Sequence, residues 1–438
     1  MKPRFQRFDE HLLVPEAHVL DSRIERSFSE KGTIKILFTG FYPPSPVPDA
    51  DFLDEIVKAS VDGGHDVIVL APETSSAKTE NPKVLPLARK WDWHDVRRVA
   101  KQAVQEKPDV VVLIYIYYLG NGHPAITMLP FLLRRLGYRG RIVTVFENQA
   151  GFARKKYPLV SAFLKVLQAA TSRNAFSEHY GSILSSDRSI CLSFSHAKEV
   201  SDKAKQKIQG LTVLPPFSTL VMAPFGPQSR SEGRRLLGIG EDKIVVTFFG
   251  YLKGSKRVDL LLEAADKLRN DPRFFFLIAG DEFPYDPGCE DSLKKKTMEL
   301  QLQDRVHFTG SYPAGSDCAS LWLHASDMAV LPFKGAVNLH NSSLSACLRH
   351  GLPTIVTEDA ELSGRPDGKY IRACTKTVVD ADARSLAEAI SSIATNPEES
   401  ERLRRAALDA YAEFYAEEGF VRGLTVFDGT RIGLDPVA

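Results

Sequence analysis

The stretch FKGAVNLHNSSLSACLRHGLPTIVT, residues 333–357, is the part of the chain that decides the fold. It follows an apolar, strand-like run at residues 328–332 and contains a polar loop, a short apolar helix pattern and a second strand pattern at residues 354–357. A loop of small polar residues that opens a helix leaves backbone N–H groups unpaired at the positive end of the helix dipole. The stretch therefore predicts either a site for an anion such as a phosphate or an ordinary capped helix. The N-cap candidates and donors are Asn341, Ser342 and Ser343.

Strand and helix patterns alternate along the chain from about residue 33 to about residue 395. Continuous apolar runs such as residues 110–117 are typical of strands that are covered on both faces. Repeated strand–helix units of this kind predict parallel sheets. The expected strands are 34–39, 66–70, 110–117, 141–146, 189–195 and 212–214, then 244–249, 274–279, 306–309, 328–331 and 354–357. The expected helices include 124–136, 258–268, 385–394 and 398–416.

A proline-rich break near residue 220 separates two such series of similar size. We therefore predict an α/β fold of two doubly wound, Rossmann-like domains that face each other across a cleft, with ligands beyond the carboxyl ends of the strands. The predicted parts are an N-terminal extension (1–32), a first domain (33–220), a linker (221–240), a second domain (241–400) and a C-terminal helix and tail (401–438) that packs back on the first domain.

Composition narrows the class of protein. A net charge of +1 over 438 residues gives no argument for a nucleic-acid partner, and we expect none. No apolar run approaches the roughly 20 residues that span a bilayer, and the first residues lack the apolar core of a secretory signal. The five cysteines are scattered without a C-x-x-C pair, so we expect reduced thiols and a cytoplasmic protein.

Five motifs follow the linker in a fixed order. They are FFGYLKGSKRVDLLLEA (248–264), IAGD (278–281), DRVHFTGSYP (304–313), LWLHASDMAVLP (321–332) and the closing HGLPTIVT. In this order they resemble the nucleotide-sugar-binding domain of the retaining GT-B glycosyltransferases, the glycosyl transferases group 1 or family 4-like enzymes. KILFTGFYPP and GGHDVIVLAPE, near the start of the first domain, resemble the opening of the same family. The resemblance implies the GT-B fold and a nucleotide diphosphate sugar as donor substrate.

The first of these motifs contains the main candidate for binding the donor diphosphate. Gly250 ends a strand where the backbone can approach a ligand closely, and Lys256 can place a point charge on a diphosphate. In the family the matching lysine neutralises the leaving diphosphate, whereas a solvated lysine at a helix start is the plainer reading. Tyr251 stands where the family commonly has arginine. Gly280 and Asp281 are expected to line the nucleotide pocket, although Asp281 could equally be a turn residue.

The chain departs from the family at a pair of glutamates that are spaced eight residues apart. Asn338 and Ala346 occupy those positions, so the chain resembles the subset that lacks the Glu-x7-Glu pair and carries a loop of small residues. The candidates for sugar and diphosphate contacts are then Asn338, His340, Asn341, Ser342 and Ser343.

In the first domain two strand-end residues are candidates for the acceptor side. His123 follows the flexible LGNG sequence, and Glu147 follows the strand at 141–146, where it could bind acceptor hydroxyls or accept a proton. A surface histidine near a cap and a solvated glutamate are nearly as plausible. Asp49 and Asp51 compete for the same role.

The implied reaction is transfer of a sugar to an acceptor hydroxyl with retention, in the biosynthesis of glycans, glycolipids or polysaccharides. Neither a metal nor a cofactor is expected. The acceptor could be a glycan, a lipid-linked molecule or a small molecule. The alternatives are a non-catalytic nucleotide-sugar-binding scaffold and another GT-B enzyme, such as a sugar-nucleotide epimerase or a phosphorylase.

Residues 131–175 carry nine Lys or Arg and one acid around an apolar helix pattern. Such a segment could make a peripheral contact with anionic lipid at the inner face of a membrane. The reading favoured by the pattern alone is a helix half buried against the sheet.

Overall fold

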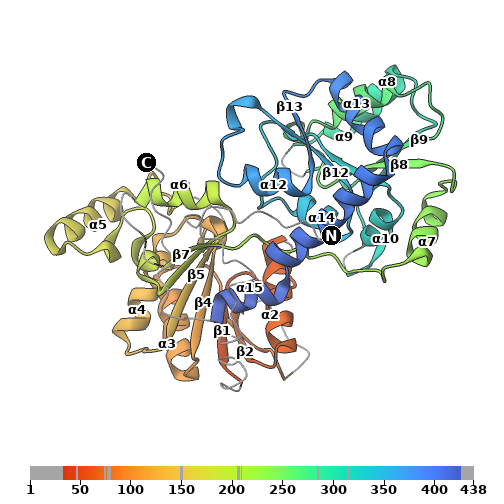
Figure 1. Ribbon diagram of the computed structural model, residues 1–438. Coiled ribbons are helices and arrows are strands. Elements are labelled where there is room, and N and C mark those ends of the chain that lie inside the picture. The colour runs from red at the N-terminus through yellow and green to blue at the C-terminus, as the bar shows by residue number, and fades with distance from the viewer. Residues whose placement is uncertain are drawn as a thin grey trace, which may run out of the picture. The chain divides into compact units, whose positions relative to one another are not determined.

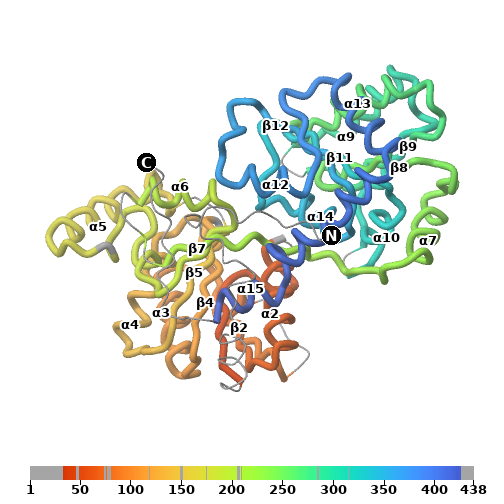
Figure 2. The backbone as a smooth tube through the Cα atoms, viewed as in Figure 1, coloured from red at the N-terminus to blue at the C-terminus, as the bar shows by residue number. Residues whose placement is uncertain are grey.

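The computed structural model describes residues 33–45, 48–73, 75, 80–147, 151–204, 208, 210–283, 286–313 and 315–425. The predicted N-terminal extension, 1–32, lies outside these residues. The chain divides into two compact units (Figures 1 and 2). Unit 1 contains Met1–Pro215 and Glu417–Ala438, and unit 2 contains Pro216–Ala416.

Unit 1 is built on a parallel sheet of seven strands in the order β3-β2-β1-β4-β5-β6-β7. The strands are β1 (Lys35–Thr39), β2 (Asp66–Pro72), β3 (Lys83–Ala88), β4 (Val110–Tyr115), β5 (Arg141–Phe146), β6 (Arg188–Cys191) and β7 (Leu211–Val213). The helices are α2 (Pro48–Asp62), α3 (Trp93–Glu106), α4 (Leu129–Arg135), α5 (Pro158–Thr171), α6 (Phe194–Ala204) and α15 (Glu417–Thr425). Short 3-10 helices are η1 (Tyr117–Gly120), η2 (Pro124–Met128), η3 (Asn174–Phe176) and η4 (Gly181–Ser185).

Unit 2 is built on a parallel sheet of six strands in the order β10-β9-β8-β11-β12-β13. The strands are β8 (Ile244–Phe249), β9 (Phe274–Ala279), β10 (Val306–Gly310), β11 (Met328–Leu331), β12 (Thr354–Glu358) and β13 (Lys376–Val379). The helices are α7 (Pro227–Leu237), α8 (Val258–Lys267), α9 (Cys289–Glu299), α10 (Cys318–His324), α11 (Ser342–Arg349), α12 (Gly368–Cys374), α13 (Ala383–Thr395) and α14 (Pro397–Phe414). The 3-10 helices are η5 (Gly254–Lys256) and η6 (Ala360–Leu362).

Burial on both faces explains the apolar strand sequences. Every residue of β4 is buried, since this strand lies between β1 and β5 in the sheet. In each sheet the strand order reverses at a central pair, β1 and β4 in unit 1 and β8 and β11 in unit 2. The carboxyl ends of such a pair are the usual place for a ligand in a doubly wound sheet. The α/β class and the two doubly wound units are confirmed.

Several boundaries differ from the prediction. The expected strand at 189–195 ends at Cys191, because helix α6 begins at Phe194. The expected helix at 124–136 opens as the 3-10 helix η2 before α4 begins. Strands β3 and β13 and helices α3, α7 and α15 were not predicted. All five cysteines are free thiols, and three of them are buried. Among the described residues, no helix is both long enough and apolar enough to cross a bilayer.

The stretch 221–240, predicted to be a linker, contains helix α7 instead. The polar sequence of this stretch is typical of an exposed linker, whereas its central charged residue, Arg234, is buried in the helix. Arg234 is 1% exposed, and its guanidinium donates hydrogen bonds to the carbonyl oxygens of Ala325, Gly240 and Lys243 and pairs with Asp327. Gly233 lies so close to α10 that an added Cβ would come within 3 Å of the Leu321 carbonyl oxygen.

The C-terminal helices divide between the units. Helix α14 packs on α11, α12 and α13 of unit 2. Helix α15 packs on α2 of unit 1, where Phe420 meets Phe52 in an edge-to-face contact at 5.5 Å. Of the predicted C-terminal part 401–438, the described residues after 416 therefore belong with unit 1 and the earlier ones with unit 2.

Replacing Gly233 by alanine should lower the free energy of unfolding by on the order of 1–3 kcal/mol, because the methyl group would force α7 away from α10. The matched control is Gly419→Ala in α15, which is exposed and has no atom within 4 Å of an added Cβ. There alanine should stabilise the helix by about 0.5–1 kcal/mol. Thermal unfolding of both variants should shift in opposite directions, and a neutral Gly233→Ala would contradict the described packing of α7.

Candidate functional site

Two strand ends and the start of α11 meet in unit 2. Gly250 follows β8 and Gly280 follows β9, with φ angles of 130° and 141° that only glycine adopts readily. A Cβ at Gly280 would come within 3 Å of the Gly250 carbonyl oxygen, and a Cβ at Gly250 would come within 3 Å of the Ser343 hydroxyl oxygen. The two glycines therefore let the strand ends and the start of α11 approach one another closely.

The loop before α11 is fixed by its two asparagines. The backbone N–H of Asn338 donates to Asn341 Oδ1 at 2.8 Å, and the backbone N–H of His340 donates to Asn338 Oδ1 at 2.9 Å. Asn341 occupies the N-cap position, but its side chain makes no cap hydrogen bond. Both side-chain carbonyl groups therefore hold the loop and not the helix. Over the described chain, neither Nδ2 group has a hydrogen-bond partner, so both remain available as donors.

Two backbone N–H groups in the first turn of α11 therefore remain free. The N–H groups of Leu344 and Ser345 donate to the Asn341 carbonyl oxygen. The N–H groups of Ser342 and Ser343 and the Ser343 hydroxyl have no hydrogen-bond partner within the described residues. A helix N-terminus with free N–H groups favours a negatively charged ligand.

Lys256 lies beside this loop at the end of η5. Its Nζ is 3.3 Å from the centre of the Phe333 ring, and the backbone N–H of Lys334 donates to the Ser255 carbonyl oxygen at 2.9 Å. Burial, with a smaller effect of the nearby Lys253, lowers the pKa of Lys256 to about 7. At neutral pH this lysine is therefore only partly charged.

Tyr251 and Asp281 are exposed residues that directly follow Gly250 and Gly280. The Tyr251 side chain is 46% exposed and meets the Phe283 ring edge to face at 5.7 Å. Asp281 Oδ1 accepts from the Glu282 N–H at 2.8 Å, and its carbonyl oxygen accepts from Leu252. These bonds fit the turn reading of Asp281, whose side chain is exposed, and its role in lining a nucleotide pocket stays a prediction.

A buried network holds the backbone of the same loop at residues 337–339. The sequence analysis did not predict this network. Arg365 donates to the Val337 carbonyl oxygen and pairs with Asp367 and Glu358. The Tyr415 hydroxyl donates to the Leu339 carbonyl oxygen at 3.1 Å. Burial raises the pKa of the Asp367 carboxyl. No spacing pattern links these distant residues to the loop, so no sequence signal could have found them.

In unit 1, His123 acts as the N-cap of η2. Its Nδ1 accepts from the Ala125 N–H at 3.1 Å, and its ring contacts Trp93 and Tyr157 at centroid distances of 5.8 and 5.1 Å. Burial lowers the pKa of His123, which favours a neutral imidazole. This geometry fits the cap reading.

The candidate acids of unit 1 lie at two places. Glu147 is half-buried directly after β5, and its N–H donates to the Tyr115 carbonyl oxygen at 3.0 Å. Residues 148–150 lie outside the described residues. Asp49 and Asp51 stand in the first turn of α2, where negative charge is favoured by the helix dipole. Burial and the neighbouring Asp54 raise the pKa of Asp51. The acceptor roles of these residues stay predictions.

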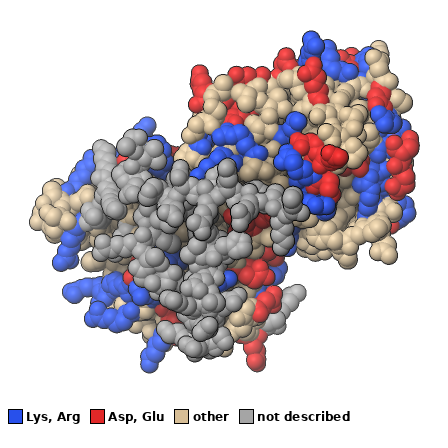
Figure 3. Space-filling view, in the orientation of Figure 1, with Lys and Arg blue, Asp and Glu red and all other residues tan. Residues whose placement is uncertain are grey.

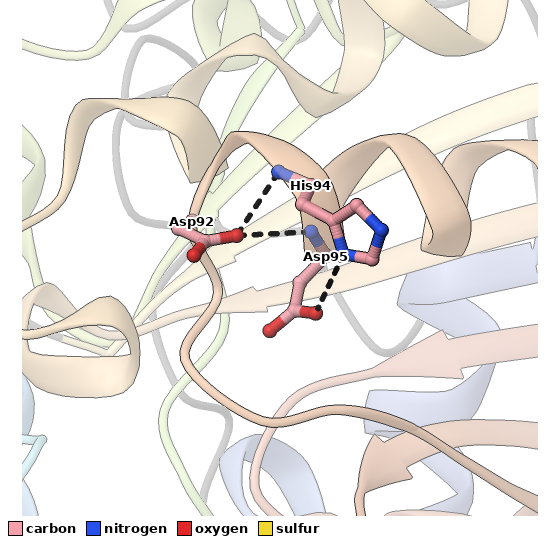
Figure 4. A group of neighbouring side chains, drawn as sticks. All are labelled: Asp92, His94 and Asp95. Carbon is pink, nitrogen blue, oxygen red and sulfur yellow. Dashed lines mark hydrogen bonds and ion pairs between the residues drawn. The ribbon is translucent and has the colours of Figure 1, made fainter.

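Asp92, His94 and Asp95 form a further cluster at the start of α3 (Figure 4). Asp92 Oδ1 accepts from the N–H groups of His94 and Asp95, which caps the helix. Asp95 Oδ2 accepts from three successive backbone N–H groups, those of Arg89, Lys90 and Trp91. These bonds give both carboxylates a structural role, and they account for the cluster without a metal ion.

Comparisons with known proteins agree with this picture. Residues 243–396 match the family Glycosyl transferases group 1. The D-inositol 3-phosphate glycosyltransferase of Saccharomonospora viridis is 29% identical over 197 residues, which cover 43% of this chain and 44% of that protein. The enzyme of the same name from Actinosynnema mirum is 28% identical over 208 residues, covering 45% and 48%. The matches thus span less than half the length of these relatives.

Solved structures match over most of the chain. The crystal structure of a glycosyltransferase from Rickettsia africae aligns with a TM-score of 0.66 at 13% identity, covering 90% of this chain and 97% of that one. HepE from Anabaena, crystallised with UDP and glucose, aligns with a TM-score of 0.59 at 16% identity, covering 89% and 98%. At these identities the likeness shows the fold alone.

The architecture of both units and the match of the second lead to one assignment. The chain has the GT-B fold, and its residues 243–396 match the family of the group 1 glycosyl transferases.

Proposed function

We propose that this chain is a glycosyltransferase that moves a sugar from a nucleotide diphosphate sugar to an acceptor hydroxyl, with retention and without a metal or cofactor. The observation that carries the proposal is the free first turn of α11, which meets Gly250 within the segment that matches the family. The UDP-glucose complex of HepE supports a nucleotide sugar as donor. The name of the relatives makes an inositol phosphate one candidate among small-molecule, glycan and lipid-linked acceptors.

The diphosphate would lie against the N-terminus of α11. The Ser342 and Ser343 N–H groups and the Ser343 hydroxyl would donate to its oxygens, and Gly250 and Gly280 give the backbone room to approach. Charge develops on the diphosphate as the sugar leaves, and donors already in place stabilise that charge without reorganising. The free Nδ2 groups of Asn338 and Asn341 would donate to sugar hydroxyls.

Lys256 supplies the positive charge in this scheme. Its Nζ lies over the Phe333 ring, where burial favours the neutral form of the amine. A diphosphate beside it would favour the charged form and raise its pKa again. Donor binding above pH 7 would therefore take up a proton, while below pH 7 the lysine is already charged.

On the acceptor side, Glu147 or His123 would orient the hydroxyl or take its proton. Both follow strand ends of unit 1, which is the edge where a doubly wound sheet binds ligands. A cytoplasmic location, where nucleotide sugars are available, belongs to the same proposal.

The direct test is a thermal-shift screen of the whole chain against nucleotide diphosphate sugars, followed by transfer assays with the sugar that stabilises it. A ligand that binds only the folded state raises the unfolding temperature. We expect one donor to stabilise the protein and an acceptor extract to release its nucleotide. Failure of every nucleotide sugar to stabilise the chain would refute the proposal.

Lys256→Ala should weaken binding of that donor about 10-fold to 100-fold, since hydrogen bonds to charged groups contribute roughly 1.5–3 kcal/mol. For the unchanged protein, the dissociation constant should rise by up to about tenfold per pH unit above pH 7, because binding takes up a proton. Calorimetry at pH 8 in buffers of different ionisation enthalpy measures this proton directly.

The matched control is Lys267→Ala, at the opposite end of helix α8. It should keep both the affinity and the proton uptake. Equal affinities for Lys256→Ala and Lys267→Ala would show that the diphosphate lies elsewhere.

Arg365→Gln should raise the dissociation constant of the donor by on the order of tenfold, because the loop at 337–341 would lose its brace. Arg372→Gln is the control, since Arg372 pairs with the same Glu358 but makes no bond to this loop. Both variants disturb the buried Glu358, so similar losses of thermal stability are expected. Only Arg365→Gln should weaken donor binding, and a parallel loss in both variants would rule out a positioning role for Arg365.

A non-catalytic nucleotide-sugar-binding protein is the second candidate. The observation that favours it is Asn338 and the buried Ala346 at the positions of the family's two glutamates. Donor binding without release of nucleotide, with any acceptor extract, would support this candidate over the transferase.

A further inference from the structure

Helix α5 of unit 1 exposes three of its large apolar side chains. Leu159 is 84% exposed, Phe163 is 61% exposed and Val166 is 65% exposed, while Leu164 is buried. The helix packs on η3 and lies at the outer edge of unit 1, away from the sheet (Figure 1). The prediction of a helix half buried against the sheet is therefore wrong: α5 packs on η3, and its face with Leu159, Phe163 and Val166 is exposed.

The three exposed side chains form one stripe. Leu159, Phe163 and Val166 are spaced by four and three residues, so they project from the same side of the helix. Leaving such large apolar groups together in water is unfavourable, and a contiguous stripe of this kind usually marks an interaction surface.

Basic residues flank the stripe along the sequence. Arg154, Lys155 and Lys156 precede α5, Lys165 lies on it and Arg173 follows it, and all five are exposed. We name these five residues, together with Leu159, Phe163 and Val166, the α5 patch. At the place of α5, the space-filling view shows neutral side chains flanked by basic ones (Figure 3).

Few acids offset this charge. No Asp or Glu occurs between Glu147 and Glu178. Glu178 pairs with Arg154 and Lys165, at 3.0 Å each. Over the described residues, Lys155, Lys156 and Arg173 have no ion pair. The patch therefore combines an apolar stripe with uncompensated positive charge.

The apolar stripe and the positive charge together favour an anionic bilayer over a second copy of the chain as the partner of the α5 patch. In a symmetric dimer of this chain, the same patch would face itself and bring like charges together, which is unfavourable. A bilayer with anionic headgroups satisfies both features, because the stripe enters the boundary of the acyl region and the basic side chains remain among the phosphates. We propose that the α5 patch docks unit 1 on the surface of an anionic lipid bilayer. This inference does not depend on the proposed transferase activity.

The test is co-sedimentation of the full chain with vesicles of phosphatidylcholine alone or mixed with phosphatidylglycerol. We expect binding to the anionic vesicles only, weakened by salt because surface charges are screened. The variant Leu159→Ser/Phe163→Ser and the variant Lys155→Glu/Lys156→Glu should each reduce binding at least about tenfold. Leu236→Ser, which removes a 49%-exposed leucine from α7 of unit 2, should bind like the unchanged protein.

Three results would overturn the proposal. They are equal binding to neutral and anionic vesicles, no binding to either, and unchanged binding of both α5 variants. Sedimentation velocity tests the alternative that the α5 patch binds a second copy of the chain. That alternative would be supported if the unchanged protein were a dimer and Leu159→Ser/Phe163→Ser were a monomer. The α5 variants should keep the thermal shift with the nucleotide sugar. Loss of that shift in the unchanged protein would count against the proposed function and not against lipid docking.

Discussion

The close approach of Gly250, Gly280 and Ser343 is the constraint on which the second unit's site depends. Parallel strands that end at the same edge bring their following residues together, but side chains would normally keep the backbones apart. Two glycines at positive φ remove that obstacle and let the start of α11 reach the end of β8. The first turn of α11, with its free N–H groups, therefore lies at the end of β8.

The side-chain carbonyl groups of Asn338 and Asn341 accept hydrogen bonds from the loop and not from α11. If Asn341 capped α11 in the ordinary way, one of the free N–H groups of the first turn would be satisfied internally. Because Asn341 accepts from Asn338 instead, the loop is rigid while the helix end stays open. Arg365 and Tyr415 add to this rigidity from the buried side. The result is a preorganised set of donors that needs little rearrangement to meet an anion.

Much of the fold could be predicted because the parallel strands have apolar sequences that burial on both faces requires. Strands 141–146, 244–249, 274–279 and 328–331 have the predicted bounds. Helix α7 could not be recognised, since Arg234 and Gly233 give it the composition of a linker. Two partners of the buried Arg234, Ala325 and Asp327, lie about 90 positions away in the sequence. For the candidate site, local patterns predicted roles for Gly250, Lys256 and Ser343, and these roles stay predictions. The ring of Phe333 beneath Lys256 and the brace formed by Arg365 depend on tertiary contacts that no local pattern encodes.

The return of α15 to unit 1 has a consequence for dividing the protein into fragments. Unit 1 is discontinuous in sequence, since Phe420 packs on Phe52 and the Arg188 guanidinium donates to the Gly423 carbonyl oxygen at 2.6 Å. A fragment that stops at residue 215 would expose the surface of α2 that Phe420 covers, whereas residues 216–416 form one uninterrupted segment. An isolated first unit would therefore need α15 supplied through a new connection, as in a circular permutant. The second unit could be excised with two simple cuts.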